Sequence, residues 1–529
     1  MFKKILFLSL VILFGFSNAI CLAKYSGGDG SESNPYRISN PYDMNDIGLH
    51  DEDWASHFVL TDDIDLAQFT GTQFNIIGEF VFLGHPDNKP FTGVFDGNGF
   101  TISNFNYQIT DTDNIGLFSY VDGAEIKDLT LIDTNVNAGT GNIVGSLVGF
   151  LYYGNVTNCC VEGGHISGVN GVGGLVGRNR MVFVAIEEND TPYESVGINQ
   201  ITDSYTTNSV SGSSAVGGLV GCNDGTIKNC YAVGNVVGSS GAIGGMVGVN
   251  SFARVSNCYA AGDVVGDVNI GGLVGKNYAT EISNCYATGS VTGSDNIGGL
   301  VGSSEYYWYL NWLSGITHCY AIGDVSGTTS VGGLLGYSDG TSYTKCFWDS
   351  DANPDINGIG NDTDPNVIGE TTENMQKETT FTSVGWDFVG ETINGPNDIW
   401  TINDGNDYPI HVWPLVNFVG WYEVDLKDYS FFARCWMDNM PCSSADLVNN
   451  GFIDLEDFAH FAGYWLLTSC GTCGGADLTG DGDVNNPDLL KFADCWLKTN
   501  CRQADLDFSG SIDNKDLAIF TKYWLIGLQ

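Results

Sequence analysis

Three segments near the C-terminus place oxygen-bearing side chains at the spacing of a calcium-binding loop. Ca²⁺ takes about six to eight oxygen ligands, and a loop of about 12 residues supplies them from positions 1, 3, 5, 7, 9 and 12, with glycine at position 6 for a sharp turn. The segments are "ADLVNNGFIDLEDFAHFAGYWL" (445–466), "ADLTGDGDVNNPDLLKFADCWL" (476–497) and "ADLDFSGSIDNKDLAIFTKYWL" (504–525). The spacing predicts calcium as the cofactor of this part of the chain.

The second and third loops fill every ligand position, whereas the first is incomplete because Val448 occupies position 3. The alternative is that the acidic residues only cap the following helices, but glycine at one fixed offset in three copies favours calcium. The second loop offers Asp477, Thr479, Asp481, the Asp483 carbonyl, Asn485 and Asp488. The third offers Asp505, Asp507, Ser509, the Ser511 carbonyl, Asp513 and Asp516. The first offers Asp446, Asn450, Asp454 and Asp457, and we expect it to bind weakly or not at all.

Each loop is followed by a predicted helix in which a phenylalanine stands four residues before a tryptophan, so both lie on one face and form a small core. Six cysteines lie at the ends of these helices and predict local disulfides in an exported module. Cys470-x-x-Cys473 has a redox or zinc half-site as its alternative, but a second such pair or a nearby histidine is missing. The predicted pairs are Cys435 with Cys442, Cys470 with Cys473, and Cys495 with Cys501.

These loop-and-helix units resemble type I dockerin repeats, modules that attach carbohydrate-active proteins to cohesins. The resemblance covers residues 416–529 and implies a small α-helical module that folds with calcium and takes a cohesin-like protein partner. The chain departs from the usual two repeats, because it has three and a further helix at 428–437. Loop positions 10 and 11, a Ser-Thr-like pair in many dockerins, read Leu455-Glu456, Asn486-Pro487 and Asn514-Lys515.

The middle of the chain repeats the phrase Gly-Gly-Leu-Val-Gly or a near copy. Four of the seven copies are spaced by 27 residues, and a fixed period of this size is typical of a stacked repeat architecture. The residues between copies are β-branched and aromatic, interrupted by Gly, Asn, Ser and Asp, which favours two or three short strands per unit. The fold class is therefore mainly β, a parallel β-helix or solenoid with coils of ~27 residues. We expect the glycines at corners that need positive φ or close backbone approach. The copies start at Gly145, Gly173, Gly217, Gly244, Gly271, Gly298 and Gly332.

The phrase Asn-Cys-Tyr keeps the same period and places one cysteine per coil. A metal or redox ladder is one interpretation, and a stack of small buried hydrophobic side chains is the favoured one. Disulfides between coils are disfavoured because coils stack ~4.8 Å apart, beyond the usual Cβ separation. The column comprises Cys159, Cys230, Cys258, Cys285, Cys319 and Cys346, with Ser204 in one unit.

Two insertions, at 178–196 and 303–315, interrupt the repeat and are candidates for ligand specificity. The second contains an aromatic cluster of the kind that stacks on sugar rings, although it could equally cover the side of the solenoid. This predicts a polysaccharide as a ligand. The cluster comprises Tyr306, Tyr307, Trp308, Tyr309 and Trp312.

The repeats resemble the GLUG motif family, named for its Gly-Leu-x-Gly signature and found in exported bacterial proteins, including some IgA-specific metallopeptidases. The resemblance implies a β-helix-like stalk. The segments 25–48, 57–67 and 91–105 are similar to the opening coils of such proteins, and 346–358, 371–376 and 398–413 to their closing segment. The predicted organisation is a signal peptide at 1–23, capping coils at 24–140, the GLUG solenoid at 141–348, a closing segment at 349–415 and the dockerin-like module at 416–529.

The charge and the N-terminus predict where the protein works. A net charge of −43 argues against nucleic acid and anionic lipid as partners. The start of the chain has two lysines, an apolar run over 5–16 and small residues after it, as in a secretory signal peptide. A membrane anchor is disfavoured because the run is shorter than the ~20 residues of a span. A lipoprotein through Cys21 is disfavoured by the bulky Ile20. We therefore expect a secreted or cell-surface protein without a membrane span.

The sequence offers no catalytic residues. None of the seven histidines lies in His-Glu-x-x-His, and Gly-x-Ser-x-Gly is absent. Asp263, Asp267, Asp295 and Asp324 lie at predicted turns, where solvated caps are the ordinary interpretation. The favoured hypothesis is a non-catalytic solenoid for adhesion, display or a carbohydrate-associated scaffold. The alternative is a β-helix polysaccharide lyase or glycoside hydrolase that its dockerin carries into a complex.

Overall fold

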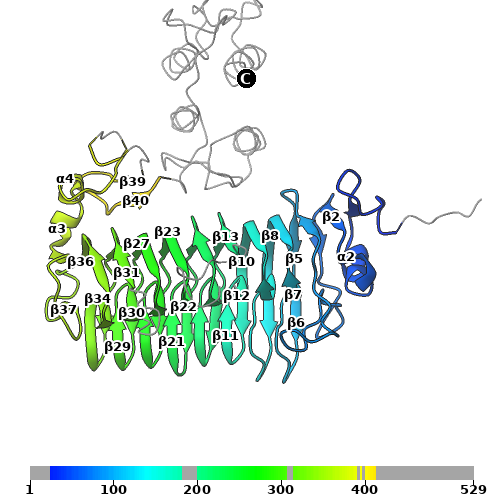
Figure 1. The fold of residues 1–529 in the computed structure, drawn as a ribbon, viewed down its shortest axis with the longest axis horizontal. Coiled ribbons are helices and arrows are strands. Elements are labelled where there is room, and N and C mark those ends of the chain that lie inside the picture. The colour runs from blue at the N-terminus through cyan, green and yellow to red at the C-terminus, as the bar shows by residue number, and fades with distance from the viewer. Residues whose placement is uncertain (1–23, 181–198, 307–313, 390–392, 396–398, 413–529) are drawn as a thin grey trace, which may run out of the picture.

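The computed structural model describes residues 24–180, 199–306, 314–389, 393–395 and 399–412, which form a long rod of stacked parallel coils (Figure 1). The chain runs along the rod once, and strands from successive coils pair side by side into two long sheets. One sheet has 24 strands and the other 14, with the pairings parallel in both. The predicted parallel β-solenoid is confirmed for these residues.

A single coil illustrates the unit. The chain passes from β26 (Val274–Tyr278) through β27 (Glu281–Ala287) and β28 (Val291–Thr292) to β29 (Asp295–Gly298). β27 and β28 belong to the 24-stranded sheet, and β26 and β29 to the 14-stranded sheet. The coil therefore has four strands, so the prediction of two or three was too low. Short Gly, Asn and Ser corners divide runs that the sequence suggested were continuous.

The remaining strands repeat this arrangement. The opening coils contain β1 (Tyr36–Ile38), β2 (His57–Leu60), β3 (Ile64–Asp65), β4 (Val94–Asp96), β5 (Thr101–Ser103), β6 (Asn106–Gln108), β7 (Phe118–Asp122), β8 (Glu125–Asn137), β9 (Val148–Tyr152) and β10 (Asn155–Ser167). The middle contains β11 (Asn170–Gly173), β12 (Val176–Arg180), β13 (Gln200–Thr202), β14 (Tyr205–Thr206), β15 (Ser209–Gly212), β16 (Ser214–Gly217), β17 (Val220–Asn223), β18 (Thr226–Lys228), β19 (Tyr231–Ala232), β20 (Val236–Gly238), β21 (Gly241–Gly244), β22 (Val247–Ser251), β23 (Arg254–Ala260), β24 (Val264–Val265) and β25 (Val268–Gly271). The last coils contain β30 (Val301–Glu305), β31 (Gly315–Thr317), β32 (Tyr320–Ala321), β33 (Val325–Ser326), β34 (Thr329–Asp339), β35 (Ser342–Thr344), β36 (Cys346–Asp349), β37 (Asn357–Ile359) and β38 (Val367–Glu370).

The Gly-Gly-Leu-Val-Gly phrases are in register along the 14-stranded sheet. Gly217 pairs with Gly244, Gly244 with Gly271, and Gly271 with Gly298. A Cβ atom on Gly244 would lie 2.1 Å from the Val247 carbonyl oxygen, so close backbone approach explains this glycine. Positive φ is found two residues earlier instead, for example at Ala242, where φ is 61°. Of the two predicted reasons for the motif glycines, close approach is the one that applies.

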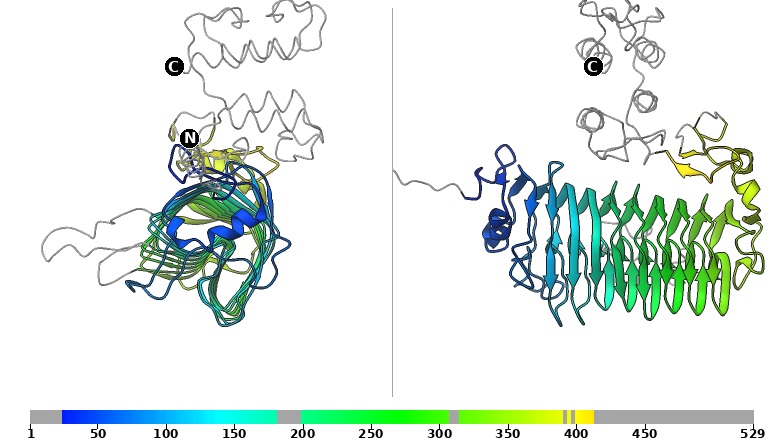
Figure 2. Two further views of the ribbon diagram at one scale, coloured as in Figure 1. Left: turned by 90° about the vertical axis from the view of Figure 1, so that its right-hand side faces the viewer. Right: turned by 180° about the vertical axis from the view of Figure 1, so that it is seen from behind.

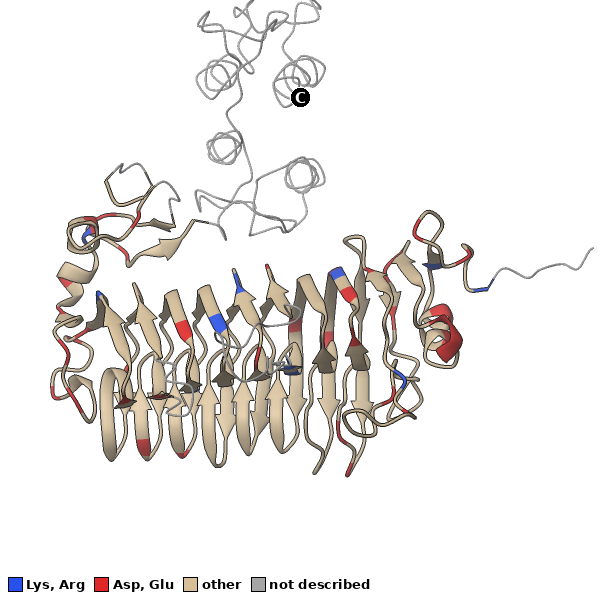
Figure 3. Ribbon diagram, viewed as in Figure 1, with Lys and Arg blue, Asp and Glu red and all other residues tan. Residues whose placement is uncertain are grey.

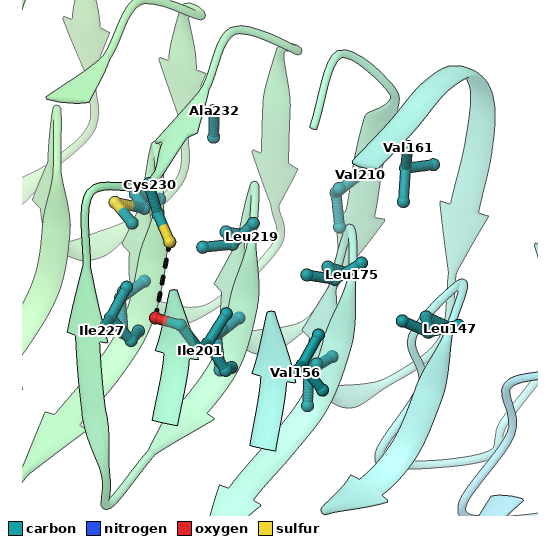
Figure 4. Close-up of a cluster of buried hydrophobic side chains, with 14 of the residues drawn as sticks. Leu147, Val156, Val161, Leu175, Ile201, Val210, Leu219, Ile227, Cys230 and Ala232 are labelled. Carbon is teal, nitrogen blue, oxygen red and sulfur yellow. Dashed lines mark hydrogen bonds between the residues drawn. The ribbon is translucent and has the colours of Figure 1, made fainter. Parts of the chain in front are cut away.

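The core consists of columns of inward side chains, one from each coil. Leu147, Leu175 and Leu219 form one column, and Val156 lies in register with Ile201 in another (Figure 4). All five side chains are fully buried. Burial of apolar surface contributes ~25 cal/mol per Å², so each coil is stabilised mainly by the two coils that cover it.

Both ends of the rod are covered. Helix α2 (Pro41–Ile47) lies across the coils at the N-terminal end and buries Met44 and Ile47, and the short helix η1 (Asp51–Asp53) follows it (Figure 2). Asn40 caps α2 by accepting hydrogen bonds from the backbone N–H groups of Tyr42 and Asp43. At the other end, helices α3 (Thr372–Met375) and α4 (Glu378–Thr382) lead to the antiparallel pair β39 (Trp400–Thr401) and β40 (Ile410–His411), which lies back along the edge of the rod (Figure 1).

Candidate functional site

Two insertions leave the rod at the same corner of the coil. The first follows β12, which ends at Arg180, and the second follows β30, which ends at Glu305. The predicted insertion bounds, 178–196 and 303–315, were too wide at their starts, because the residues before these ends continue the strands. Strands β17, β22 and β26 lie between β12 and β30, so the two exit points are about 19 Å apart at ~4.8 Å per coil. We call the outer face of these five strands the insertion flank.

A buried asparagine ladder fixes the corner from which both insertions leave. The Nδ2 group of Asn179 donates to Asn223 Oδ1 at 2.8 Å, and Asn223 donates to Asn250 at 2.8 Å. Asn250 donates to Asn277 at 3.0 Å, and Asn277 donates to the Ser304 hydroxyl at 3.2 Å. These side chains are fully buried, so their mutual hydrogen bonds replace those lost with water. The ladder thereby fixes the register of this corner between the two exit points.

The outer face of the flank carries half-buried ion pairs. Arg178 Nη2 lies 3.3 Å from Asp224 Oδ2, and Lys276 Nζ lies 3.0 Å from Glu305 Oε1. Lys276 Nζ also lies 5.9 Å from the centre of the Tyr278 ring. Burial raises the pKa of Asp224, and the charge of Arg178 partly offsets this effect. Since each of these carboxylates is held by a cation, the face suits hydrogen bonding to a polar ligand better than proton transfer.

Cys222 lies between these pairs, in register with Arg178 on one side and Val249 on the other. Burial raises the pKa of its thiol to about 11. The thiol is therefore protonated at neutral pH and is a poor nucleophile and metal ligand.

The structure describes only Tyr306 of the predicted aromatic cluster. Tyr306 directly follows β30, and its backbone N–H donates to the Asp339 carbonyl at 3.1 Å. Its ring lies over Gly340, since a Cβ atom there would be 2.9 Å from Tyr306 Cδ1. Tyr307, Trp308, Tyr309 and Trp312 lie outside the described residues, as do all the predicted calcium ligands and the six predicted disulfide cysteines of 416–529. Those predictions remain untested. Within the described ranges, no three His, Cys, Asp or Glu side chains gather as a metal site would require.

The predicted cysteine column is confirmed as a buried stack. Its six cysteines are fully buried, Ser204 takes the equivalent place, and the thiols are free. The Cys230 thiol donates to the Lys228 carbonyl at 3.1 Å, and the Cys285 thiol donates to the Ser283 carbonyl at 3.1 Å. Burial raises the pKa of both thiols well above the ordinary value. Cys230 and Cys285 are therefore protonated at neutral pH and behave as small core residues.

Sequence reasoning missed the tyrosines of the same Asn-Cys-Tyr phrase. Their rings form a continuous stack on the outside of the rod, with centroids 4.7–5.0 Å apart and planes within 6° of parallel. The tyrosine directly after Cys230, Cys258, Cys285 and Cys319 was the available signal, because neighbours on a strand face opposite sides. The stack comprises Tyr205, Tyr231, Tyr259, Tyr286 and Tyr320.

The closing segment covers the C-terminal part of this stack. The centre of the Phe381 ring lies 4.9 Å from that of Phe347. The centre of the Trp400 ring lies 6.0 Å from that of Tyr320 and 6.0 Å from that of Tyr286. The His411 ring lies between the next two tyrosines, with its centre 5.1 Å from that of Tyr286 and 6.4 Å from that of Tyr259. Its Nε2–H group donates to the Asn284 carbonyl at 2.8 Å. The segment therefore follows the stack back along the rod, which explains why Tyr286 and Tyr320 are buried while Tyr205 and Tyr259 are half-buried.

Comparison with known proteins agrees with the repeat assignment. The GLUG motif model matches residues 212–237 and 266–292, both inside the predicted repeat region. Halomucin of Haloquadratum walsbyi is 32% identical over 165 residues, which are 30% of this chain and 2% of that protein. A protein of Evansella cellulosilytica described as a candidate Gly-rich membrane protein is 31% identical over 190 residues, which are 29% of this chain and 21% of that protein. The chain thus spans only a small part of the length of these curated relatives.

Among solved structures, a candidate immunoglobulin A1 protease from Bacteroides ovatus is similar, with a TM-score of 0.39 and 18% sequence identity over 74% of this chain and 95% of that chain. A search of the described residues for helices both long enough and apolar enough to span a bilayer found none. The chain carries GLUG motif repeats within a β-rich repeat body.

Proposed function

We propose that this chain is a non-catalytic protein of the cell surface or extracellular matrix, in which the rod displays the insertion flank to a polysaccharide. The observation that carries the proposal is the exit of both insertions at one corner, above a face whose register the asparagine ladder fixes. Insertions into a solenoid often gather on its binding face. The similarity to halomucin and to a Gly-rich membrane protein supports a location at the cell boundary.

A glycan array tests this function with the full chain. We expect binding to at least one polysaccharide, and a loss of about tenfold or more in affinity when Lys276→Ala is combined with Trp308→Ala and Trp312→Ala. Arg254→Ala on the other sheet is the matched control, because Arg254 also faces a glutamate, at 3.7 Å, but lies away from the flank. The same polysaccharides are incubated with the protein and assayed for released chain ends. Cleavage that one Asp or Glu substitution abolishes would replace this proposal with the β-helix enzyme.

The C-terminal part of the proposal is attachment through calcium. The second and third loops of 445–525 bind Ca²⁺ and order a dockerin-like module that takes a protein partner. Isothermal titration of the full chain should detect about two strong sites. Asp477→Ala and Asp505→Ala, each at position 1 of a complete loop, should each remove one site. Asp446→Ala at position 1 of the incomplete loop is the control and should remove neither. No heat of binding, together with a circular dichroism spectrum that calcium leaves unchanged, would contradict the calcium assignment.

A further inference from the structure

A loop near the N-terminal end of the rod exposes three large apolar side chains in a row. Val81, Phe82 and Leu83 are 52%, 57% and 36% exposed. Single exposed apolar residues are ordinary, but a contiguous group costs solubility and marks an interaction surface. We call these three residues the apolar tip.

The loop that carries the apolar tip is held in one conformation. Glu79 and Lys89 form its base through two backbone hydrogen bonds of 2.7 and 2.9 Å. Asn88 spans the loop, accepting from the Val81 N–H at 2.7 Å and donating to the Phe82 carbonyl at 2.8 Å. Phe80 anchors it to the rod, with its ring centre 4.9 Å from that of Tyr120. A surface fixed before binding loses less conformational entropy when a partner docks.

The border of the apolar tip is acidic. Glu79 and Asp87 are exposed at the two sides of the loop, and Lys89 is already paired with Asp51 of η1. The His85 ring packs edge-on against the Phe82 ring, with ring centres 4.4 Å apart. Its Nδ1 atom lies 3.7 Å from Asp87 Oδ2. Figure 3 shows further acidic residues on the adjoining helix α2. Like charges disfavour an anionic membrane, and they also disfavour a second copy, which would bring two acidic borders together.

We propose that the apolar tip docks in an apolar pocket of a protein partner, and that lysine and arginine side chains border this pocket. An aromatic anchor at the centre of a polar border is the usual arrangement of a binding hot spot. The opposite charge around the pocket would speed association and set the orientation of the partner. The site lies at the opposite end of the described rod from helices α3 and α4.

Random peptides displayed on phage provide a probe that assumes no particular partner. The immobilised full chain selects peptides, and each selected peptide is then tested for binding to a Val81→Ser, Phe82→Ser, Leu83→Ser variant. The matched control carries Val233→Ser, Val237→Ser and Val265→Ser, which replace three exposed valines elsewhere on the rod. We expect peptides with apolar residues flanked by Lys or Arg, which lose at least about tenfold in affinity for the tip variant, keep it for the control and bind more weakly as salt is raised.

Selected peptides that bind the tip variant as well as the wild type, or that lack basic residues, would overturn the proposal. Flotation with phosphatidylcholine vesicles and sedimentation velocity provide the other arms of the test. Vesicle binding or self-association that the tip variant abolishes would assign the tip to lipid or to a second copy, and would overturn the protein partner. Circular dichroism and thermal melting of both variants establish that they fold, which we expect because all six residues are exposed.

Discussion

In the coils that carry the phrase Asn-Cys-Tyr, its three residues have three separate tasks. Asn257 takes positive φ, at 52°, in the conformation that asparagine tolerates better than most residues, and its side chain donates to Asn229 of the coil before at 3.2 Å. Cys258 points into the core, and Tyr259 stacks outside between Tyr231 and Tyr286. A side chain of the wrong type at any of the three positions would disturb two neighbouring coils, because each contact is made between coils.

The buried asparagine ladder gives a residue-scale prediction. Asn250→Ala should lower the free energy of unfolding by about 1–3 kcal/mol, because it leaves the amide of Asn223 without its Asn250 acceptor and removes the Asn250 donor from the oxygens of Asn277 and Thr280. Denaturant unfolding measures the change. Ser251→Ala, on the next residue of the same strand, is the control and should change stability by less than about 0.5 kcal/mol. An equal effect of the two substitutions would contradict the energetic role of the ladder.

At the scale of the strand, the second glycine of the Gly-Gly-Leu-Val-Gly phrase closely approaches the backbone of the next coil. A Cβ atom on Gly272 would lie 2.1 Å from the Gly299 carbonyl oxygen of the next coil. Both atoms belong to the backbone, so a larger side chain there has to push neighbouring coils apart.

Gly272→Ala should therefore destabilise the rod by about 3 kcal/mol or more, whereas an ordinary surface substitution costs little. Gly315→Ala is the matched control, because the nearest atom to a Cβ there is Ser342 Oγ at 3.5 Å, an ordinary contact. Thermal melting compares the two variants. If Gly272→Ala melts with the wild type, close packing is not the reason for this glycine.

The closing segment should respond to acid. Burial lowers the pKa of His411 to about 3, below its ordinary value of 6.5. The unfolded chain then binds more protons than the folded one, so this contribution to stability is present above about pH 6.5 and is lost as the pH falls toward 3. Tyr286 and Tyr259 are the titratable groups whose rings contact His411, and burial raises their pKa values, so they stay neutral over this range.

Tryptophan fluorescence between pH 7 and 3 measures release of the segment, because Trp386 and Trp400 are buried in it. We expect release of the closing segment to depend less on pH in the His411→Gln variant than in the wild type. His165→Gln, at an exposed histidine of the other end of the sheet, serves as control and should keep the wild-type profile. Identical profiles for all three proteins would show that carboxylates, and not His411, set the acid response.

At the scale of the molecule, the rod is a row of interchangeable units. Each coil contacts mainly its two neighbours, so stability is nearly a sum of coil and interface contributions. Val247 pairs with Val274, which holds the same position in the next coil. Residues 247–273 therefore make up one complete coil.

Deletion of 247–273 should yield a folded rod shorter by about 4.8 Å, because Met246 then joins Val274 in register. Tyr231 would take the place of Tyr259 beneath the closing segment. Deletion of 247–266, which is out of phase, is the control and should unfold the rod, since every inward side chain after the junction is displaced. Small-angle scattering and circular dichroism distinguish the outcomes, and equal behaviour of the two deletions would contradict the modular description.

The sequence by itself determined the repeat, its β character, the register of the glycine phrases and the burial of the cysteine column. These follow from local rules, because a period of 27 residues and an alternation of inward and outward side chains are written along the chain. Only the tertiary structure decided the four strands of a coil, the common corner of the two insertions, the return of the closing segment along the tyrosine stack and the exposed apolar tip. Each of these depends on which residues meet across coils or at the ends of the rod, and contacts between distant segments leave no periodic trace in the sequence.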